Sequence, residues 1–320
     1  MKRLAIVLPC YNEEAVIKET ASRILVLLDG MITRGEVEKN SRILFVDDGS
    51  SDQTWPIIEK LHTEFPCIYG LKLAGNTGHQ NALLAGLATA KDFSDVLISI
   101  DADLQDDICV IPEMVSKFKE GFDIVYGVRR ERNTDTFFKR TTAIMFYRLM
   151  GRLGVKSVYN HADYRLMSHR AVEQLCHYRE RNLFLRGIVP LIGYRSSCIY
   201  YDRQERFAGE SKYPLRKMMN FAVDGITSFS IRPVRMVFGM GIIFLIISLG
   251  IFIYVLHSYL MGSVVPGWAS LILSIWFVGG CILLGLGIVG EYIGKTYMEV
   301  KDRPRYNIEK LLSDETTYKH

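Results

Sequence analysis

Short apolar runs alternate with longer amphipathic stretches along the first part of the chain. The apolar runs, each of strand length, occupy residues 4–8, 42–46, 68–73, 96–100 and 124–126. Stretches with helical spacing separate them at residues 13–28, 51–65 and 77–90. Strands separated by helices of this length predict an α/β fold with βαβ units and a mainly parallel sheet. Helices then cover both faces of the sheet, which explains strands that are apolar throughout.

The pattern changes near residue 236, where charged side chains disappear. Residues 236–290 contain no Asp, Glu, Lys or Arg. Two apolar stretches, about 234–258 and 266–291, are each long enough at 1.5 Å per residue to cross a hydrocarbon core of ~30 Å. They predict a transmembrane hairpin of two helices; the alternative is a buried hairpin in a larger soluble domain.

Charges beside the two apolar stretches predict their orientation. Arginines precede the first stretch, Lys and Arg residues follow the second, and the link between them has neither. The positive-inside rule then places both termini and the N-terminal α/β domain in the cytoplasm of a multi-pass protein of the cytoplasmic membrane. Recurrent glycines in the second stretch indicate close helix packing, within the hairpin or between subunits of a homo-oligomer.

Basic and apolar residues recur at helical spacing just before the first apolar stretch. This pattern predicts an interfacial helix against anionic membrane lipids, with a plain linker helix as the alternative. The expected regions are a cytoplasmic α/β domain at 1–212, a juxtamembrane helix at 213–233, the hairpin at 234–291 and a cytoplasmic tail at 292–320.

Overall composition excludes some classes of protein. The formal net charge of +4 does not suggest a nucleic-acid-binding protein. The six cysteines have no zinc-site spacing, which is consistent with reduced thiols in a cytosolic domain. The N-terminal apolar run is too short for a signal peptide.

Acidic residues follow two of the expected strands. Asp47 and Asp48 come directly after the second strand, and Asp101 and Asp103 after the fourth. Any one of them can be a turn or cap residue. Two such pairs at one edge of a parallel sheet favour a ligand site, because ligands gather at the carboxyl ends of the strands.

The segment Asp101-Ala102-Asp103-Leu104-Gln105 is the sharpest chemical signal. If it is extended, alternation points Asp101, Asp103 and Gln105 to one side. Two carboxylates and an amide oxygen suit Mg²⁺ or Mn²⁺. Such an ion can bridge a diphosphate and neutralise charge on a departing nucleotide.

Several segments, taken in order, resemble the family-2 glycosyltransferases with the GT-A fold. More narrowly, the chain is similar to polyprenyl-phosphate glycosyltransferases related to dolichol-phosphate mannose synthase and bactoprenol glucosyltransferase. The matching segments are VLPCYNEE (7–14), VDDGSSD (46–52), NTGHQNA (76–82), DADLQDD (101–107), ADYRLM (162–167), GESKY (209–213) and GEYIGK (290–295). The resemblance covers nearly the whole chain.

This resemblance implies roles for individual residues. The nucleotide-sugar donor would be bound by Pro9, Tyr11, Glu13, Asp47, Asp48 and Asp101. The metal would be held by Asp101, Asp103 and Gln105. Catalytic roles fall to Asp163, Asp103 and Arg165. Candidates for the acceptor phosphate are Arg129, Arg140, Arg206 and Lys212.

The chemistry leaves the role of Asp163 open. A phosphate monoester, with a second pKa of ~6, is already largely a dianion at neutral pH and hardly needs a general base. Asp163 is therefore either a base or a residue that positions sugar hydroxyls.

The expected function is inverting transfer of one sugar, favoured as a UDP-sugar, to a polyprenyl phosphate such as undecaprenyl phosphate. The product would be a lipid-linked sugar for modification of a cell-envelope glycan. One alternative is a processive polysaccharide synthase, whose Gln-x-x-Arg-Trp segment this chain lacks. Others are transfer to a different membrane lipid and a non-catalytic membrane scaffold or sugar-nucleotide binder.

Overall fold

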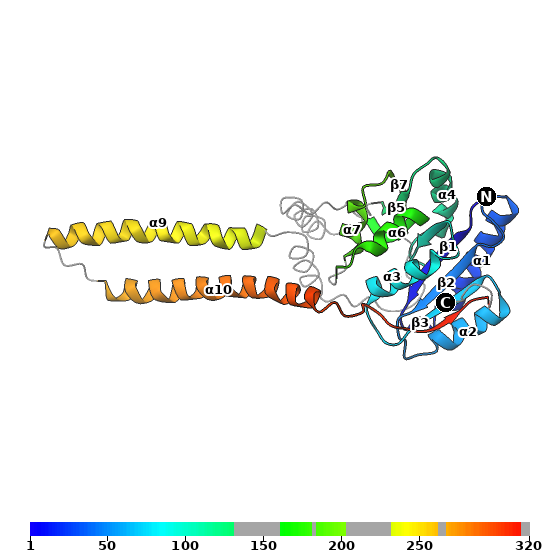
Figure 1. The fold of residues 1–320 in the computed structure, drawn as a ribbon, viewed down its shortest axis with the longest axis horizontal. Helices are drawn as coiled ribbons and strands as arrows, with labels where there is room; N and C mark the ends of the chain where they lie inside the picture. The colour runs from blue at the N-terminus through cyan, green and yellow to red at the C-terminus, as the bar shows by residue number, and fades with distance from the viewer. Residues whose placement is uncertain (131–160, 181–183, 203–231, 262–266, 315–320) are drawn as a thin grey trace. The chain divides into compact units, whose positions relative to one another are not determined.

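The computed structural model describes residues 1–130, 161–180, 184–202, 232–261 and 267–314 (Figure 1). These residues form two compact units, one from the described residues before 203 and after 302, the other from those between 232 and 302. The expected juxtamembrane helix at 213–233 lies almost entirely outside the described residues, as do Arg140, Arg206 and Lys212.

The first unit is built on an eight-stranded sheet of order β7-β5-β6-β4-β1-β2-β3-β8. The strands are β1 (Leu4–Cys10), β2 (Arg42–Asp47), β3 (Ile68–Leu73), β4 (Val96–Ser99), β5 (Ile124–Arg129), β6 (His161–Ser168), β7 (Ser196–Tyr201) and β8 (Ile308–Leu312). Neighbours are parallel in β4-β1-β2-β3 and in β5-β7. Strand β6 is antiparallel to β4 and β5, and β8 is antiparallel to β3. The predicted α/β fold with a mainly parallel sheet is confirmed.

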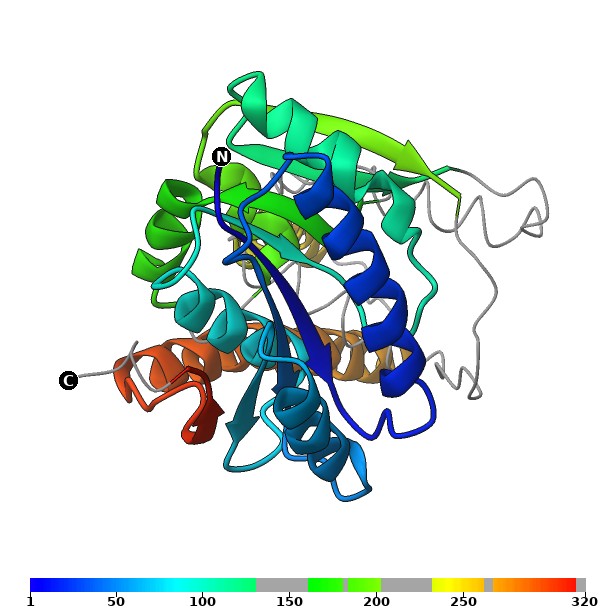
Figure 2. The same cartoon turned by 90° about the vertical axis from the view of Figure 1, so that its right-hand side faces the viewer.

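Helices cover both faces of this sheet. They are α1 (Ile17–Thr33), α2 (Thr54–Glu64), α3 (His79–Ala90), α4 (Ile111–Lys119), α6 (His169–His177) and α7 (Leu185–Leu191), with a short 3₁₀ turn η1 (Ile108–Val110) before α4. Figure 2 shows α1 and α3 on opposite sides of β1. Leu4, Ile6 and Leu8 share a core with α1, whereas Val7 faces Gly86 of α3. Burial on both faces accounts for the uninterrupted apolar character of β1.

Strand β8 comes from the region expected to be a cytoplasmic tail. It pairs with β3, and its end is tied to the sheet by Arg42, whose Nη2 lies 3.1 Å from Asp314 Oδ2. Tyr69 donates a hydrogen bond of 2.8 Å to the same oxygen. The described part of the tail after residue 302 is therefore an integral part of the first unit.

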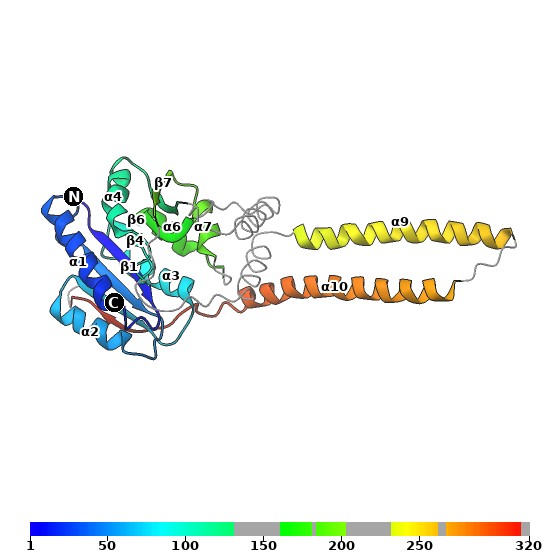
Figure 3. The same cartoon turned by 180° about the vertical axis from the view of Figure 1, so that it is seen from behind.

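The second unit consists of two long helices, α9 (Arg232–Leu260) and α10 (Trp268–Val300), side by side in both Figure 1 and Figure 3. The rings of Phe244 and Phe277 pack edge to face at 5.8 Å. A Cβ on Gly285 would lie 3.1 Å from Val237, so this glycine lets the helices approach closely.

The described residues contain one stretch that is long and apolar enough to cross a membrane by length and composition, Phe277–Val300. Its start lies within the second predicted span, and its end lies beyond it. The predicted transmembrane hairpin stays a prediction. Large apolar side chains such as Ile246 and Leu283 nevertheless face outwards on both helices.

Candidate active site

The candidate residues gather at the carboxyl edge of the central parallel strands. Because β6 runs antiparallel to β4, the start of β6 lies beside the end of β4, with Ser99 paired to Arg165. This register brings Asp163, near the start of β6, to the same edge as Asp101, which follows β4. The two acidic positions, far apart in sequence, therefore belong to one site.

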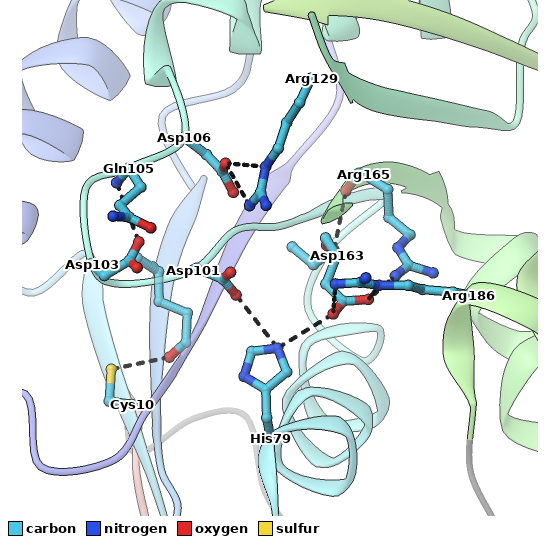
Figure 4. Close-up of polar contacts among 12 residues, drawn as sticks. Cys10, His79, Asp101, Asp103, Gln105, Asp106, Arg129, Asp163, Arg165 and Arg186 are labelled. Carbon is cyan, nitrogen blue, oxygen red and sulfur yellow. Dashed lines mark hydrogen bonds and ion pairs between the residues drawn. The ribbon is translucent and has the colours of Figure 1, made fainter. Parts of the chain in front are cut away.

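Asp163 lies at the centre of a cluster of cations (Figure 4). Its buried carboxylate accepts a short hydrogen bond from the guanidinium of Arg165. Arg186 of α7 contacts both oxygens, with its Nη2 3.2 Å from Oδ2 and its Nε 3.4 Å from Oδ1. Burial alone would raise the pKa of Asp163, but His79, Arg186 and Arg165 outweigh it and hold the pKa well below its usual range.

His79 connects this cluster to Asp101. Its Nε2 lies 3.4 Å from Asp101 Oδ1 and 3.6 Å from Asp163 Oδ2. Burial lowers the pKa of His79, but the contact with Asp163 and the charge of Asp101 prevail and raise the pKa above its ordinary value. His79 is the first residue of α3, where the positive end of the helix dipole disfavours a cation. The positive charge of the His79 imidazole is therefore favoured by Asp101 and Asp163, and not by the helix dipole.

The pKa of Asp101 is shifted in the opposite direction from that of Asp163. Burial raises the pKa of Asp101 to about 6. The charge of His79 opposes this rise, and the charges of Asp163, Asp106 and Asp103 add to it. Its Oδ1 is buried and accepts no hydrogen bond from any described residue. Beyond its contact with His79, a buried carboxylate oxygen without a hydrogen bond has capacity for an additional cation.

The segment after β4 is a turn, so the expected extended alternation of Asp101, Asp103 and Gln105 is wrong. Leu104 has a φ of 57°, and the Gln105 N–H donates to Asp103 Oδ1 over 3.2 Å. Asp103 and Gln105 lie together in Figure 4, while Asp101 faces His79. Across the described residues no three His, Cys, Asp or Glu side chains are grouped to hold a metal. The predicted metal ligands therefore stay a prediction.

Asp48 holds the loop that leads into α3. Its Oδ1 accepts hydrogen bonds from the Thr77 N–H at 2.7 Å and the Thr77 hydroxyl at 2.9 Å. Its Oδ2 accepts from the Gly78 N–H at 2.9 Å. Asp48 thereby fixes the start of α3 and the position of His79. Asp47 differs, because its Oδ2 is buried without a hydrogen bond from the described residues, and burial raises the pKa of Asp47.

The loop after β1 is bonded to the loop after β2 and to the start of α2. The Ser51 N–H donates to Asn12 Oδ1 over 2.9 Å, and the Glu13 N–H donates to Thr54 Oγ1 over 2.9 Å. Gly49 has a φ of 68°, and a Cβ there would lie 2.6 Å from the backbone of Gly75. Pro9, Tyr11 and Glu13, which are predicted to bind the nucleotide sugar, therefore lie at an edge of the sheet whose loops are held by hydrogen bonds. The Tyr11 side chain is exposed there.

Arg129, a predicted ligand of the acceptor phosphate, is paired with an acidic residue. Its Nη2 lies 2.9 Å from Asp106 Oδ1, and Tyr201 donates to the same oxygen at 2.6 Å. The other three predicted phosphate ligands fall outside the described residues.

The sequence-based prediction did not include His79, Arg186, Asp106 or Tyr201 in the site. His79 lies within one of the motifs that carry the resemblance, so a signal for it existed. Asp106 likewise belongs to the acidic segment after β4. No sequence signal marked Arg186 or Tyr201, because only the packing of α7 and β7 brings them to the site.

Comparison with known proteins identifies the family. Residues 5–176 match the model of Glycosyl transferase family 2. Uncharacterized glycosyltransferase YkoT of Bacillus subtilis is 55% identical, over 96% of this chain and 91% of that protein.

Relatives with more specific names are also similar over nearly the full chain. The prophage bactoprenol glucosyl transferase homolog of Escherichia coli is 38% identical, over 97% of this chain and 99% of that protein. Bactoprenol glucosyl transferase of Shigella phage SfII is 39% identical, over 96% of this chain and 98% of that protein. The chain therefore belongs to glycosyltransferase family 2.

Proposed function

We propose that this protein transfers a single sugar from a nucleotide sugar to a polyprenyl phosphate, with inversion at the anomeric carbon. A UDP-sugar is the favoured donor and undecaprenyl phosphate the favoured acceptor. Membership of family 2 and the relatives named bactoprenol glucosyl transferase, aligned with 96% of the chain, support the proposal. The lipid-linked product would serve to modify a cell-envelope glycan.

The arrangement of Asp101, His79, Asp163 and Arg186 is the structural observation that carries the proposal. An oxygen of the lipid phosphate forms a bond to the anomeric carbon while the bond from that carbon to the nucleotide diphosphate breaks. The bonding electrons leave with the diphosphate, and the cations His79, at the start of α3, and Arg186, on α7, would stabilise its charge. The acceptor phosphate is largely a dianion at neutral pH, so no proton has to be removed from it.

Asp163 is better suited to orient the sugar than to act as a base. Both of its oxygens are engaged by Arg165, Arg186 and His79, and these groups hold its pKa far below neutrality. A base with so low a pKa has little drive to take a proton. We therefore assign the cluster around Asp163 a role in fixing sugar hydroxyls, with Arg165 as the buried residue that positions the carboxylate.

Metal dependence is part of the proposal. Asp101, Asp103 and Gln105 offer the oxygen ligands that Mg²⁺ or Mn²⁺ prefers, and the buried Oδ1 of Asp101 fits a cation. Because no three His, Cys, Asp or Glu side chains are grouped to hold a metal among the described residues, diphosphate oxygens and water would complete the coordination. A bound ion supplies neutralisation of the departing diphosphate.

We also propose that α9 and α10 attach the protein to a membrane. Residues 1–212 would form the catalytic region, residues 213–233 would link it to the membrane surface, and residues 292–320 would lead back to the catalytic region. Strand β8, which follows α10, pairs with β3, which precedes α9. The chain must therefore start and end its passage through residues 232–302 on the same side of a membrane. An even number of crossings follows, so α10 requires α9 as its partner if either crosses.

The proposal is tested with the purified full-length protein in detergent, undecaprenyl phosphate and a panel of radiolabelled nucleotide sugars, with and without Mn²⁺. A single-sugar lipid product from one donor is expected. Absence of lipid-linked product from every donor would refute the proposal, and a polymeric product would favour a processive synthase.

The metal assignment is tested with Asp103→Ala. We expect kcat/KM to fall by about a hundredfold, as for other losses of electrostatic stabilisation at a transferring group, and more Mn²⁺ to be needed for half-maximal rate. Asp107→Ala is the matched control, because its side chain caps the N–H of Cys109 in the same loop. Undiminished activity of Asp103→Ala would refute the assignment.

A further inference from the structure

Asp106 occupies a buried position that the proposed reaction does not use. Its side chain is 0% exposed, and its Oδ1 accepts hydrogen bonds from the Tyr201 hydroxyl at 2.6 Å and from Arg129 Nη2 at 2.9 Å and Nε at 3.2 Å. Asp106 belongs to the acidic loop after β4, whereas Arg129 and Tyr201 are the last residues of β5 and β7. One carboxylate oxygen thus joins three segments of the chain.

The tyrosine in this cluster is fixed by its own packing. The rings of Tyr201 and Tyr164 meet edge to face at 5.3 Å, and Tyr164 donates to the Asp107 carbonyl at 3.1 Å. Both tyrosines are buried. A Cβ on Gly127 would lie 3.0 Å from the Tyr164 ring and 3.1 Å from the Tyr201 ring, so this glycine lets both rings pack closely against β5. The Tyr201 hydroxyl therefore has little freedom to leave Asp106.

Arg129 is held along one edge of its guanidinium group. The Nε and Nη2 atoms both face Asp106, and the side chain is 22% exposed, so the group is neither free in solvent nor fully enclosed. Figure 4 shows the guanidinium pointing towards the part of the site where Asp101 and Asp163 lie. A guanidinium fixed along one edge keeps a defined plane, which is what bidentate phosphate binding requires.

We propose that Asp106 and Tyr201 are positioning residues that hold Arg129 for a phosphate group of a substrate. Burial of the Asp106 carboxylate costs desolvation energy. Its two hydrogen bonds from Arg129 fix the plane of that guanidinium at the edge of the site. The identity of the phosphate rests on the proposed function. It belongs either to the donor diphosphate or to the lipid phosphate, and the KM of each substrate distinguishes them.

The test compares full-length Asp106→Asn, Tyr201→Phe, Arg129→Gln and the double variant Asp106→Asn/Arg129→Gln. In Asp106→Asn, the KM of one phosphate substrate should rise about tenfold to a hundredfold, the range for losing a charged hydrogen bond, with kcat and the other KM within about twofold. Tyr201→Phe should change the same KM by less. In the Arg129→Gln background, Asp106→Asn should add nothing, because its effect passes through Arg129.

Three results would overturn the proposal. One is an equal loss from Asp106→Asn with and without Arg129; another is a fall in kcat while neither KM moves. The third is the same KM shift in Asp107→Asn, which makes the same chemical change one residue further along the loop. Thermal unfolding of each variant checks folding, and Tyr201→Phe, which removes only a hydroxyl, carries the test if Asp106→Asn does not fold.

The proposed function is judged separately, on the wild-type protein in the same assay. If the wild type makes no lipid-linked sugar, the Kd values of UDP and of farnesyl phosphate are measured by calorimetry for the same variants. The weakened binding of one of these two phosphates in Asp106→Asn, and not in Asp107→Asn, would then support the positioning role. Unchanged binding of both would overturn it.

Discussion

Asp101 and Asp163 are two neighbouring carboxylates with opposite electrostatic surroundings. Arg165, Arg186 and His79 contact Asp163, whereas Asp101 has only His79 among these cations. The pKa of Asp163 is therefore far below its usual value, while burial and the neighbouring carboxylates raise that of Asp101 to about 6. When the pKa values of two neighbouring acids are shifted in opposite directions, the two acids are suited to different roles. Asp163 is fixed and permanently charged, and Asp101 is the carboxylate with capacity for a further cation.

His79→Gln should lower the thermal stability of the metal-free protein more at pH 6 than at pH 9. Burial lowers the pKa of His79, but Asp163 and Asp101 raise it overall. A raised histidine pKa stabilises the fold fully below the unfolded value of about 6.5, and this contribution is lost as pH rises through the folded value. Solvent screens the partly exposed imidazole, so we expect at most about 1 kcal/mol, or roughly 2–4 °C.

Thermal unfolding in EDTA at both pH values measures this difference. His177→Gln, at an exposed histidine on α6, is the control and should leave the two proteins alike at either pH. An equal loss of stability at pH 6 and pH 9 in His79→Gln would contradict a charged bridge between the two carboxylates.

At the scale of single elements, α3 carries His79 into the site and is seated on the sheet by a glycine. A Cβ at Gly86 would lie 2.5 Å from Val7 Cγ1 and 2.6 Å from Val46 Cγ2. Those side chains belong to β1 and β2, the strands whose ends carry the predicted donor-binding residues. The axis of α3 therefore lies closer to the sheet than a residue with a side chain would allow.

Gly86→Ala should destabilise the protein by about 1–3 kcal/mol through overpacking, partly offset by up to ~1 kcal/mol from the better helix propensity of alanine. Activity should fall as well, because displacement of α3 moves His79 away from Asp101 and Asp163. Thermal unfolding and the transfer assay measure the two effects. Gly75→Ala is the control, since a Cβ there meets nothing within 4 Å. A fully active and stable Gly86→Ala would show that α3 is not seated in this way.

Across the whole molecule, the sequence predicted what depends on local pattern. Apolar runs located the strands, because helices bury both faces of the sheet. Helix α1 begins at Ile17 instead of residue 13, because residues 14–16 form a turn before it. The turn at Leu104 was missed because positive φ is rare without glycine. Arg186 and β8 depend on contacts between segments far apart in sequence, which no local pattern records.

The pairing of β8 with β3 makes a prediction about membrane topology. Since both strands belong to one sheet, α9 and α10 must cross a membrane together or not at all. If they cross as proposed, a membrane-impermeant maleimide should label Ser263→Cys, in the link between the two helices, above the wild-type background in intact cells. Glu309→Cys, at an exposed position on β8, should be labelled only after permeabilisation. If both cysteines needed permeabilisation, the helices would not cross, and the proposed membrane hairpin would be refuted.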